Sequence, residues 1–137
     1  LVGAVEEAGL LAVIADWILD LSKGNFFLAM TLILWVAAIM SAFVDNIPFT
    51  ATMLPIVAYL SKVIPDSENT LWWALAVGAC FGGNGTIIGA SANVVTLGIA
   101  ESKGYKISFG GFMKTAFPYM LLSIGLAQVW IMIFRPG

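Results

Sequence analysis

The stretch SAFVDNIPFTATMLP, residues 41–55, places an aspartate, an asparagine and two prolines inside an otherwise apolar run. In a soluble helix these would simply be poor helix formers. In a membrane each of them carries a cost, because the bilayer interior has no water to solvate a charge or an unpaired backbone group. The meaning of this stretch therefore depends on whether the chain lies in a membrane.

The composition indicates a membrane protein. Hydrophobic residues make up 61% of the 137 residues and charged residues only 10%, whereas soluble domains carry about 25% charged residues. The mean hydropathy is +0.99. A water-soluble chain of this length could not hide so much apolar surface in its interior.

The few polar residue types exclude several classes of site. The net charge of −2, with no basic cluster, argues against nucleic acid as a partner. The chain has no histidine and a single cysteine, Cys80, which excludes zinc sites, disulfides and Cys–His catalysis within it. We expect no cofactor beyond a coupling ion, and we expect Cys80 to be a small packing residue. Because the chain begins at Leu1 and shows no signal-peptide pattern, we interpret it as a piece of a longer polypeptide.

The first segment, residues 1–24, is predicted to be the end of a scaffold helix and an amphipathic arm. From about residue 10, apolar residues recur at helical spacing, with Asp16 and Asp20 on the opposite face. This pattern suits a helix lying at the membrane interface and ended by Gly24 and Asn25. The alternative is the end of an ordinary spanning helix.

Residues 26–60 are predicted to form a re-entrant hairpin. These 35 residues are too many for one crossing of about 20 residues and too few for two crossings with a turn. We assign one arm to residues 26–40, the tip to residues 41–48 and the other arm to residues 49–60. Pro48 suits the first turn of the second arm, where its missing N–H costs nothing.

Residues 71–102 are predicted to form a broken helix. The sequence FGGNGTIIGASAN, residues 81–93, contains four glycines that weaken a continuous helix, so we expect half-helices over residues 71–80 and 93–102. The alternative is a small-residue packing face. Four side chains with oxygen atoms count against that alternative, because a packing face does not need them: Asn84, Thr86, Ser91 and Asn93.

A final transmembrane helix is predicted over residues 112–134, and the lysines give its orientation. Residues 101–114 hold three lysines, whereas residues 61–70 hold one lysine beside two acidic residues. Positive residues favour the cytoplasmic side. We therefore expect the hairpin to open to the outside and the loop after Glu101 to face in.

Two interrupted apolar elements predict a transport site near the middle of the bilayer. Asp45 is the only acidic residue deep in an apolar segment, and a carboxylate there costs about 2.5–3.5 kcal/mol on insertion scales. It could bind a cation or exchange a proton; alternatively, Asp45 or Asn46 caps the second arm.

Thr50 and Thr52 either contribute oxygen atoms to the site or donate hydrogen bonds back to carbonyls of their own helix. We expect the five tryptophans to lie at the membrane–water interfaces or to pack between helices.

Two long motifs resemble a known family. SAFVDNIPFTATMLPI, residues 41–56, and GACFGGNGTIIGASANVVTLGIAESKGY, residues 78–105, are similar to the P-protein, arsenite-permease and Na+/H+-antiporter branch of the ion transporter superfamily. That superfamily also includes citrate and dicarboxylate carriers. The resemblance implies two inverted repeats around a central site, with this chain as most of the second repeat.

The resemblance also implies site residues and partners. It places Asp45, Asn46 and Thr50 at the hairpin tip, with a Na+ site at Asp45, Asn46 and Asn93. It places five residues in the unwound stretch: Gly85, Thr86, Ser91, Ala92 and Asn93. The implied partners are the lipid bilayer of a cell inner or plasma membrane, the first repeat of the same polypeptide, and a second copy in a homodimer.

These observations predict a secondary active transporter of a small ion, coupled to H+ or Na+, and not an enzyme. The dicarboxylate carriers have Ser-Asn-Thr at the hairpin tip, whereas this chain has Asp-Asn-Ile-Pro, which favours ion exchange. The alternatives are an arsenite or other anion permease, a citrate or dicarboxylate permease, and a membrane assembly subunit without transport. An intramembrane enzyme is disfavoured, because the chain offers one deep carboxylate, no histidine and thus no second catalytic group.

Overall fold

The structure is a computed structural model that describes residues 10–64 and 69–134. Within these ranges all of its regular elements are helices, so the all-α prediction is confirmed. Residues 1–9 of the predicted first segment and part of the loop over residues 61–70 lie outside the described ranges. In chain order the helices are α2 (Leu10–Ser22), α3 (Phe26–Ser41), α4 (Asn46–Val63), α5 (Thr70–Gly82), α6 (Ser91–Ser102) and α7 (Phe109–Phe134).

The helix α2 ends where the sequence predicts. Lys23 and Gly24 adopt positive φ angles of 50° and 71°, and Asn25 then caps α3 by accepting a hydrogen bond from the Phe27 N–H at 3.0 Å. The helix contacts both α3 and α4 through Ile18, which is buried, while Trp17 is 70% exposed. Part of the predicted apolar face is therefore turned away from the other helices, and the interfacial position of α2 stays a prediction.

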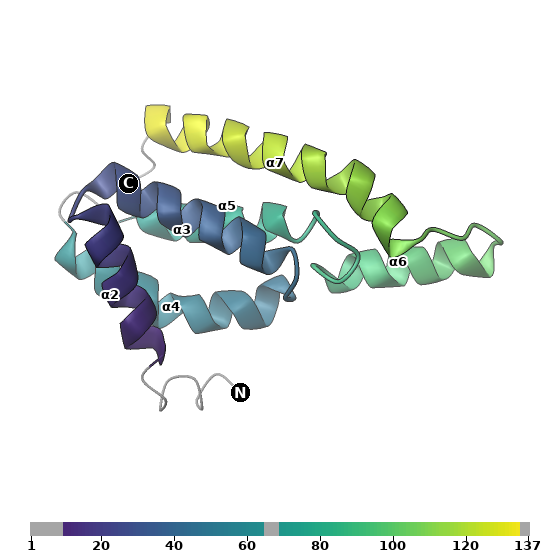
Figure 1. Ribbon diagram of the computed structural model, residues 1–137, viewed down its shortest axis with the longest axis horizontal. Helices are drawn as coiled ribbons and strands as arrows, with labels where there is room; N and C mark the ends of the chain where they lie inside the picture. Colours follow the sequence, from purple (N-terminus) through teal and green to yellow (C-terminus); the bar gives the residue numbers. More distant parts are fainter. Residues whose placement is uncertain (1–9, 65–68, 135–137) are drawn as a thin grey trace.

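The predicted hairpin is present as two helices joined by a short turn (Figure 1). The helix α3 has 16 residues and α4 has 18, which correspond to lengths of about 24 and 27 Å. Both are shorter than the roughly 30 Å hydrocarbon core of a bilayer. In the described part of the chain, only α7, with 26 residues, is long and apolar enough to cross. These lengths suit hairpin arms that do not span the membrane, and the re-entrant course itself stays a prediction.

In the described part of the chain, the most extensive helix contact is that of α3 with α5. A Cβ atom added at Gly82 would overlap the backbone of Ala38, and one at Gly78 would lie 2.9 Å from the Ala37 Cβ. The Ser41 hydroxyl also donates a buried hydrogen bond of 2.7 Å to the Ala79 carbonyl. The packing-face alternative is therefore correct for Gly82, and Gly78, which lies before the predicted break, packs in the same way, because small residues let these two helices approach.

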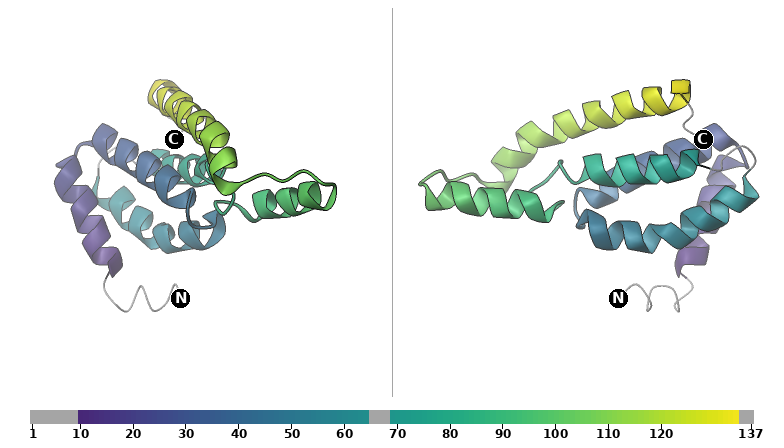
Figure 2. Two further views of the ribbon diagram at one scale, coloured as in Figure 1. Left: turned by 45° about the vertical axis from the view of Figure 1, so that its right-hand side comes forward. Right: turned by 180° about the vertical axis from the view of Figure 1, so that it is seen from behind.

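The apolar core lies where α3, α4, α5 and α7 meet. It is built from aliphatic and methionine side chains, including Met30, Leu34, Ile56, Leu75 and Ile124, all at most 2% exposed. Figure 2 shows α3 and α5 between α4 on one side and α7 on the other.

The predicted break within residues 71–102 is confirmed. The helix α5 ends at Gly82 and α6 begins at Ser91, and residues 83–90 between them are not helical. The helix α6 begins two residues earlier than expected. The helix α7 begins at Phe109 rather than at residue 112, because the Ser108 hydroxyl accepts a hydrogen bond of 3.1 Å from the Gly111 N–H, as a capping residue does. The helix α6 projects from the other helices and has no buried residue (Figures 1 and 2).

Candidate functional site

The unwound segment, residues 83–90, folds against the hairpin tip. The Thr86 side chain is fully buried there. Its hydroxyl donates to the Ala42 carbonyl and accepts from the Gly89 N–H at 3.2 Å. Because both hydrogen-bonding functions of this hydroxyl are used, Thr86 acts as a fixed connection between the break and the tip.

Gly89 brings the two backbones into direct contact. A Cβ atom at this position would lie 2.8 Å from the Ala42 carbonyl oxygen and 3.0 Å from that of Ser41. Real Cβ atoms do not approach oxygen atoms this closely, so a side chain would push the unwound segment away from the tip. The close approach of the tip backbone therefore requires glycine at position 89.

Asp45 stands at the junction of the two interrupted elements. It is the N-cap of α4, and its Oδ1 accepts a long hydrogen bond of 3.4 Å from the Ile47 N–H. Its Oδ2 accepts a hydrogen bond from the hydroxyl of Ser91, the first residue of α6. The predicted capping role is therefore real, and the same carboxylate also joins the N-terminal ends of α4 and α6. These ends carry partial positive charge, which stabilises an anion.

Asn93 holds the unwound segment from the opposite side. Its Nδ2 donates to the carbonyls of Gly83 and Thr86, each at 2.9 Å. An opened backbone frees carbonyls that can coordinate a cation, but these two are occupied by an amide of the chain itself. The side-chain oxygen of Asn93 is left for other partners, because both bonds use its nitrogen.

Asn46 and Thr50 line a separate pocket on α4. This pocket has a volume of about 370 Å³ and is otherwise lined by Ile47, Ala51, Leu54 and Cys80. Cys80 is exposed there, so its predicted role as a packing residue is wrong. Thr52, by contrast, bonds back to the Pro48 carbonyl at 3.0 Å, which is the structural alternative foreseen for the threonines.

The structure thus brings together some of the predicted site residues and not others. Asp45 and Ser91 are in direct contact, and Thr86 and Asn93 hold the backbone next to them. Three further residues lie in or beside the unwound segment without a side-chain contact to Asp45: the exposed Asn84 and Ala92 and the buried Gly85.

The oxygen atoms at the junction suit a cation that binds several kinds of oxygen ligand. In the described part of the chain, no three His, Cys, Asp or Glu side chains come close enough to hold a metal. A cation at the junction would therefore meet one carboxylate, a hydroxyl and amide oxygens. Alkali and alkaline-earth cations take such oxygen ligands, whereas zinc prefers nitrogen and sulfur.

Sequence reasoning missed a polar contact between α3 and α7. The Trp35 indole donates to the Gln128 Oε1 at 2.6 Å, and the Gln128 Nε2 donates to the Thr31 hydroxyl at 3.2 Å. Trp35 therefore forms a specific polar contact as well as packing between helices. The sequence could have indicated such a contact, because Gln128 is the only amide side chain in the predicted final helix, and a polar group in hydrocarbon needs a partner.

Comparison with known proteins identifies the family. The CitMHS family, described as a citrate transporter family, matches residues 1–135. The chain belongs to this transporter family. It is therefore a polytopic α-helical membrane protein, as its composition and its long apolar helix α7 indicate.

Similar curated proteins come from distant organisms. The P protein of Mus musculus is 50% identical over 114 residues, which is 80% of this chain and 13% of that protein. A 46 kDa membrane protein of Mycobacterium leprae is 44% identical over 133 residues, which is 96% of this chain and 31% of that protein. An uncharacterized transporter of Mycobacterium tuberculosis is 46% identical, with the same coverage. The chain thus spans less than a third of the length of these relatives. No solved structure is a significant match.

Proposed function

We propose that this chain forms part of a secondary active transporter that exchanges a small cation, with H+ or Na+ as the coupling ion. The observation that carries the proposal is the position of Asp45, whose carboxylate lies where the hairpin tip meets the broken helix. An acidic group inside an apolar segment is costly and normally serves a substrate or ion pathway. Interrupted helices that meet near the membrane centre form the binding sites of many secondary transporters.

The charge at this junction favours a cation. Asp45 is the only charged residue in the hairpin tip and the unwound segment, and the lysines nearest to Asp45 along the sequence are Lys23 and Lys62. The Ser91 hydroxyl that donates a hydrogen bond to this carboxylate is neutral, and so is the Asn93 amide two residues further along α6. A carboxylate beside neutral oxygen atoms attracts a cation without adding further charge.

A carboxylate can couple the ion to a proton by competition. When Asp45 is ionised, it binds the cation; when it is protonated, its charge is lost and the cation is released. The Ser91 hydroxyl donates to the ionised form and so orients one carboxylate oxygen. Thr86 and Asn93 act as positioning residues, because they fix the unwound backbone next to this pair.

The rest of the transporter is proposed to complete the site. The chain covers 31% of the mycobacterial relatives, which leaves room for a preceding repeat with its own hairpin. The helix α6 has no buried residue in the structure, which fits a helix that other parts of the polypeptide cover. We place the protein in a cell inner or plasma membrane.

Citrate is the second candidate substrate, because the matching family is described as a citrate transporter family. The described junction has a negative charge and no cationic side chain, so citrate would need positive charge from outside this chain. For this reason citrate is a weaker candidate substrate than a cation. An anion permease, such as one for arsenite, is a weaker candidate for the same reason.

The test is ion flux by the full-length protein in liposomes, with Na+, H+, chloride, arsenite and citrate measured separately. We expect cation exchange that is lost in Asp45→Asn and retained in Asp20→Asn, because Asp20 is exposed on α2. Uptake of citrate with no cation exchange would favour the second candidate. No flux of any of these ions would favour an assembly subunit.

A further inference from the structure

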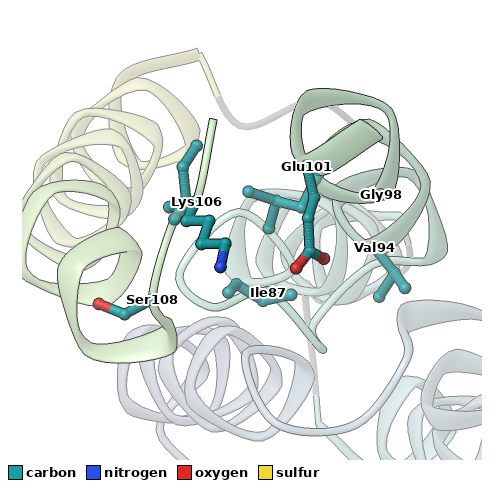
Figure 3. A pocket seen from close by; sticks show the side chains of 8 residues that line it. Ile87, Val94, Gly98, Glu101, Lys106 and Ser108 are labelled. Carbon is teal, nitrogen blue, oxygen red and sulfur yellow. The ribbon is translucent and has the colours of Figure 1, made fainter. Parts of the chain in front are cut away.

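A cavity of about 580 Å³ adjoins the unwound segment on the side away from Asp45's helix α4. It lies between α6 and the connector, residues 103–108, which runs back along α6 toward α7 (Figures 1 and 3). This volume holds on the order of 20 water molecules. The lining residues are Ile87, Val94, Leu97, Gly98, Glu101, Lys106, Ile107 and Ser108.

The cavity reaches from the candidate site to the end of α6. Ile87 belongs to the unwound segment, and Val94 follows Asn93, the residue that holds that segment. From Val94 the lining continues along one face of α6, at intervals of three and four residues, as far as Glu101. The cavity therefore extends from the unwound segment along α6 to Glu101, with the connector along its other side.

Two opposite charges lie on opposite walls of the cavity. The Glu101 carboxylate comes from the last turn of α6, and the Lys106 ammonium group comes from the connector. Figure 3 shows both side chains pointing into the space between them. A carboxylate in such a cavity attracts cations and an ammonium group repels them, so the passage of a cation depends on whether the two groups are paired.

We propose that this cavity is the access path by which the transported cation reaches the unwound segment from the connector side, with Glu101 and Lys106 as its gate. Glu101 draws the cation in, and Lys106 closes the path when it pairs with Glu101. This inference rests on the proposed cation transport but concerns residues outside the Asp45 junction. Neither residue contributes to the contacts that hold the junction together.

Gly98 offers a way to obstruct the path without disturbing the fold. A Cβ atom added at Gly98 meets no atom within 4 Å, so a larger side chain would enter the cavity rather than clash. Gly125 on α7 is a matched control, because a Cβ atom there also meets nothing within 4 Å and Gly125 does not line this cavity. In the full-length protein in liposomes, Gly98→Leu should reduce cation flux about tenfold or more by narrowing the path. Gly125→Leu should leave it unchanged.

A labelling experiment tests the path without relying on transport. In the full-length protein with Cys80→Ala and Lys106→Gln, which leaves Glu101 as the charge in the cavity lining, Gly98→Cys should react about tenfold faster with a cationic thiol reagent than with an anionic one of similar size. That preference should disappear when Glu101→Gln is added. The control Gly125→Cys should show no preference that depends on Glu101.

The two experiments separate this inference from the proposed function. If the wild-type protein moves no cation, the proposed function fails, and labelling still decides whether a cation-selective path exists. If cation exchange is present but Gly98→Leu transports like the wild type, the path is wrong. Equal labelling rates for both reagents at residue 98, or no labelling there, would also overturn it.

Discussion

The carboxylate of Asp45 accepts a hydrogen bond from the hydroxyl of Ser91, 46 positions further along the chain. This bond joins the N-cap of α4 to the first residue of α6, and these two helices make no other close approach in the described structure. The tip of the hairpin and the break in the next helix are therefore parts of one site. Movement of α6 relative to the hairpin would change the surroundings of the carboxylate directly.

Removal of the Ser91 hydroxyl should loosen this site. We expect Ser91→Ala to lower the free energy of unfolding by on the order of 1 kcal/mol, because a hydrogen bond to a carboxylate is lost, and to slow ion exchange. Ser91→Thr keeps the hydroxyl and should restore both. Ser123→Ala is the control, since Ser123 only bonds back to the Tyr119 carbonyl in α7. Thermal unfolding and flux of the purified full-length protein measure these effects, and equal behaviour of the two alanine variants would contradict the role of Ser91.

Loss of the Asn93 amide should affect the unwound segment more than the carboxylate. Asn93→Ala leaves the carbonyls of Gly83 and Thr86 without their donor, and a polar group left unpaired costs about 1–3 kcal/mol when it is buried. We expect weaker ion binding with the pH dependence of exchange preserved. Flux measured over a range of cation concentrations and pH values tests this, and loss of the pH dependence would show that Asn93 takes part in the proton step.

The contact of Gln128 with Trp35 and Thr31 should stabilise α7 against α3. Hydrogen bonds between membrane helices average about 0.6 kcal/mol each, so we expect Gln128→Leu to lower stability by roughly 1 kcal/mol. The leucine keeps the apolar character of α7, so insertion into the membrane should not change. Unfolding of the purified protein in detergent checks this prediction. Unchanged stability of Gln128→Leu would mean that the bond has no role.

The re-entrant course of the hairpin predicts that both of its outer ends lie on one side of the membrane. Cysteines placed singly at Lys23 and Lys62, in a Cys80→Ala background, should both react with an impermeant reagent applied from outside. Lys23 precedes α3 and Lys62 lies in the last turn of α4. Labelling from opposite sides would mean that α3 and α4 together cross the bilayer.

The sequence was informative where single residues interrupt an apolar run. The glycines of residues 81–93 predicted the break between α5 and α6, and Gly24 with Asn25 predicted the end of α2. Asp45 could be singled out because nothing else in its segment is charged. These features are local, so the order of residues along the chain reveals them.

Contacts between distant residues could not be read from the sequence. Nothing in the order of residues indicates that Ser91 meets Asp45 or that Asn93 binds the carbonyls of the unwound segment. The exposure of Cys80 was likewise invisible, because it depends on which face of α5 packs against α3. These contacts and exposures depend on how whole helices pack together. Glycines such as Gly82 allow two helices to approach closely, but they do not determine which helices do so.

The most direct test of the account is the pH dependence of cation exchange by full-length Asp45→Asn in liposomes, at protein content matched to the wild type. Asparagine keeps the size and much of the hydrogen bonding of aspartate but cannot gain or lose a proton. In the wild type, protons compete with the cation for Asp45, so exchange at low cation concentration should slow as the pH falls. Asp45→Asn should insert normally and show no pH-dependent exchange. Exchange at the wild-type rate, with the wild-type pH dependence, would reduce Asp45 to the cap of α4.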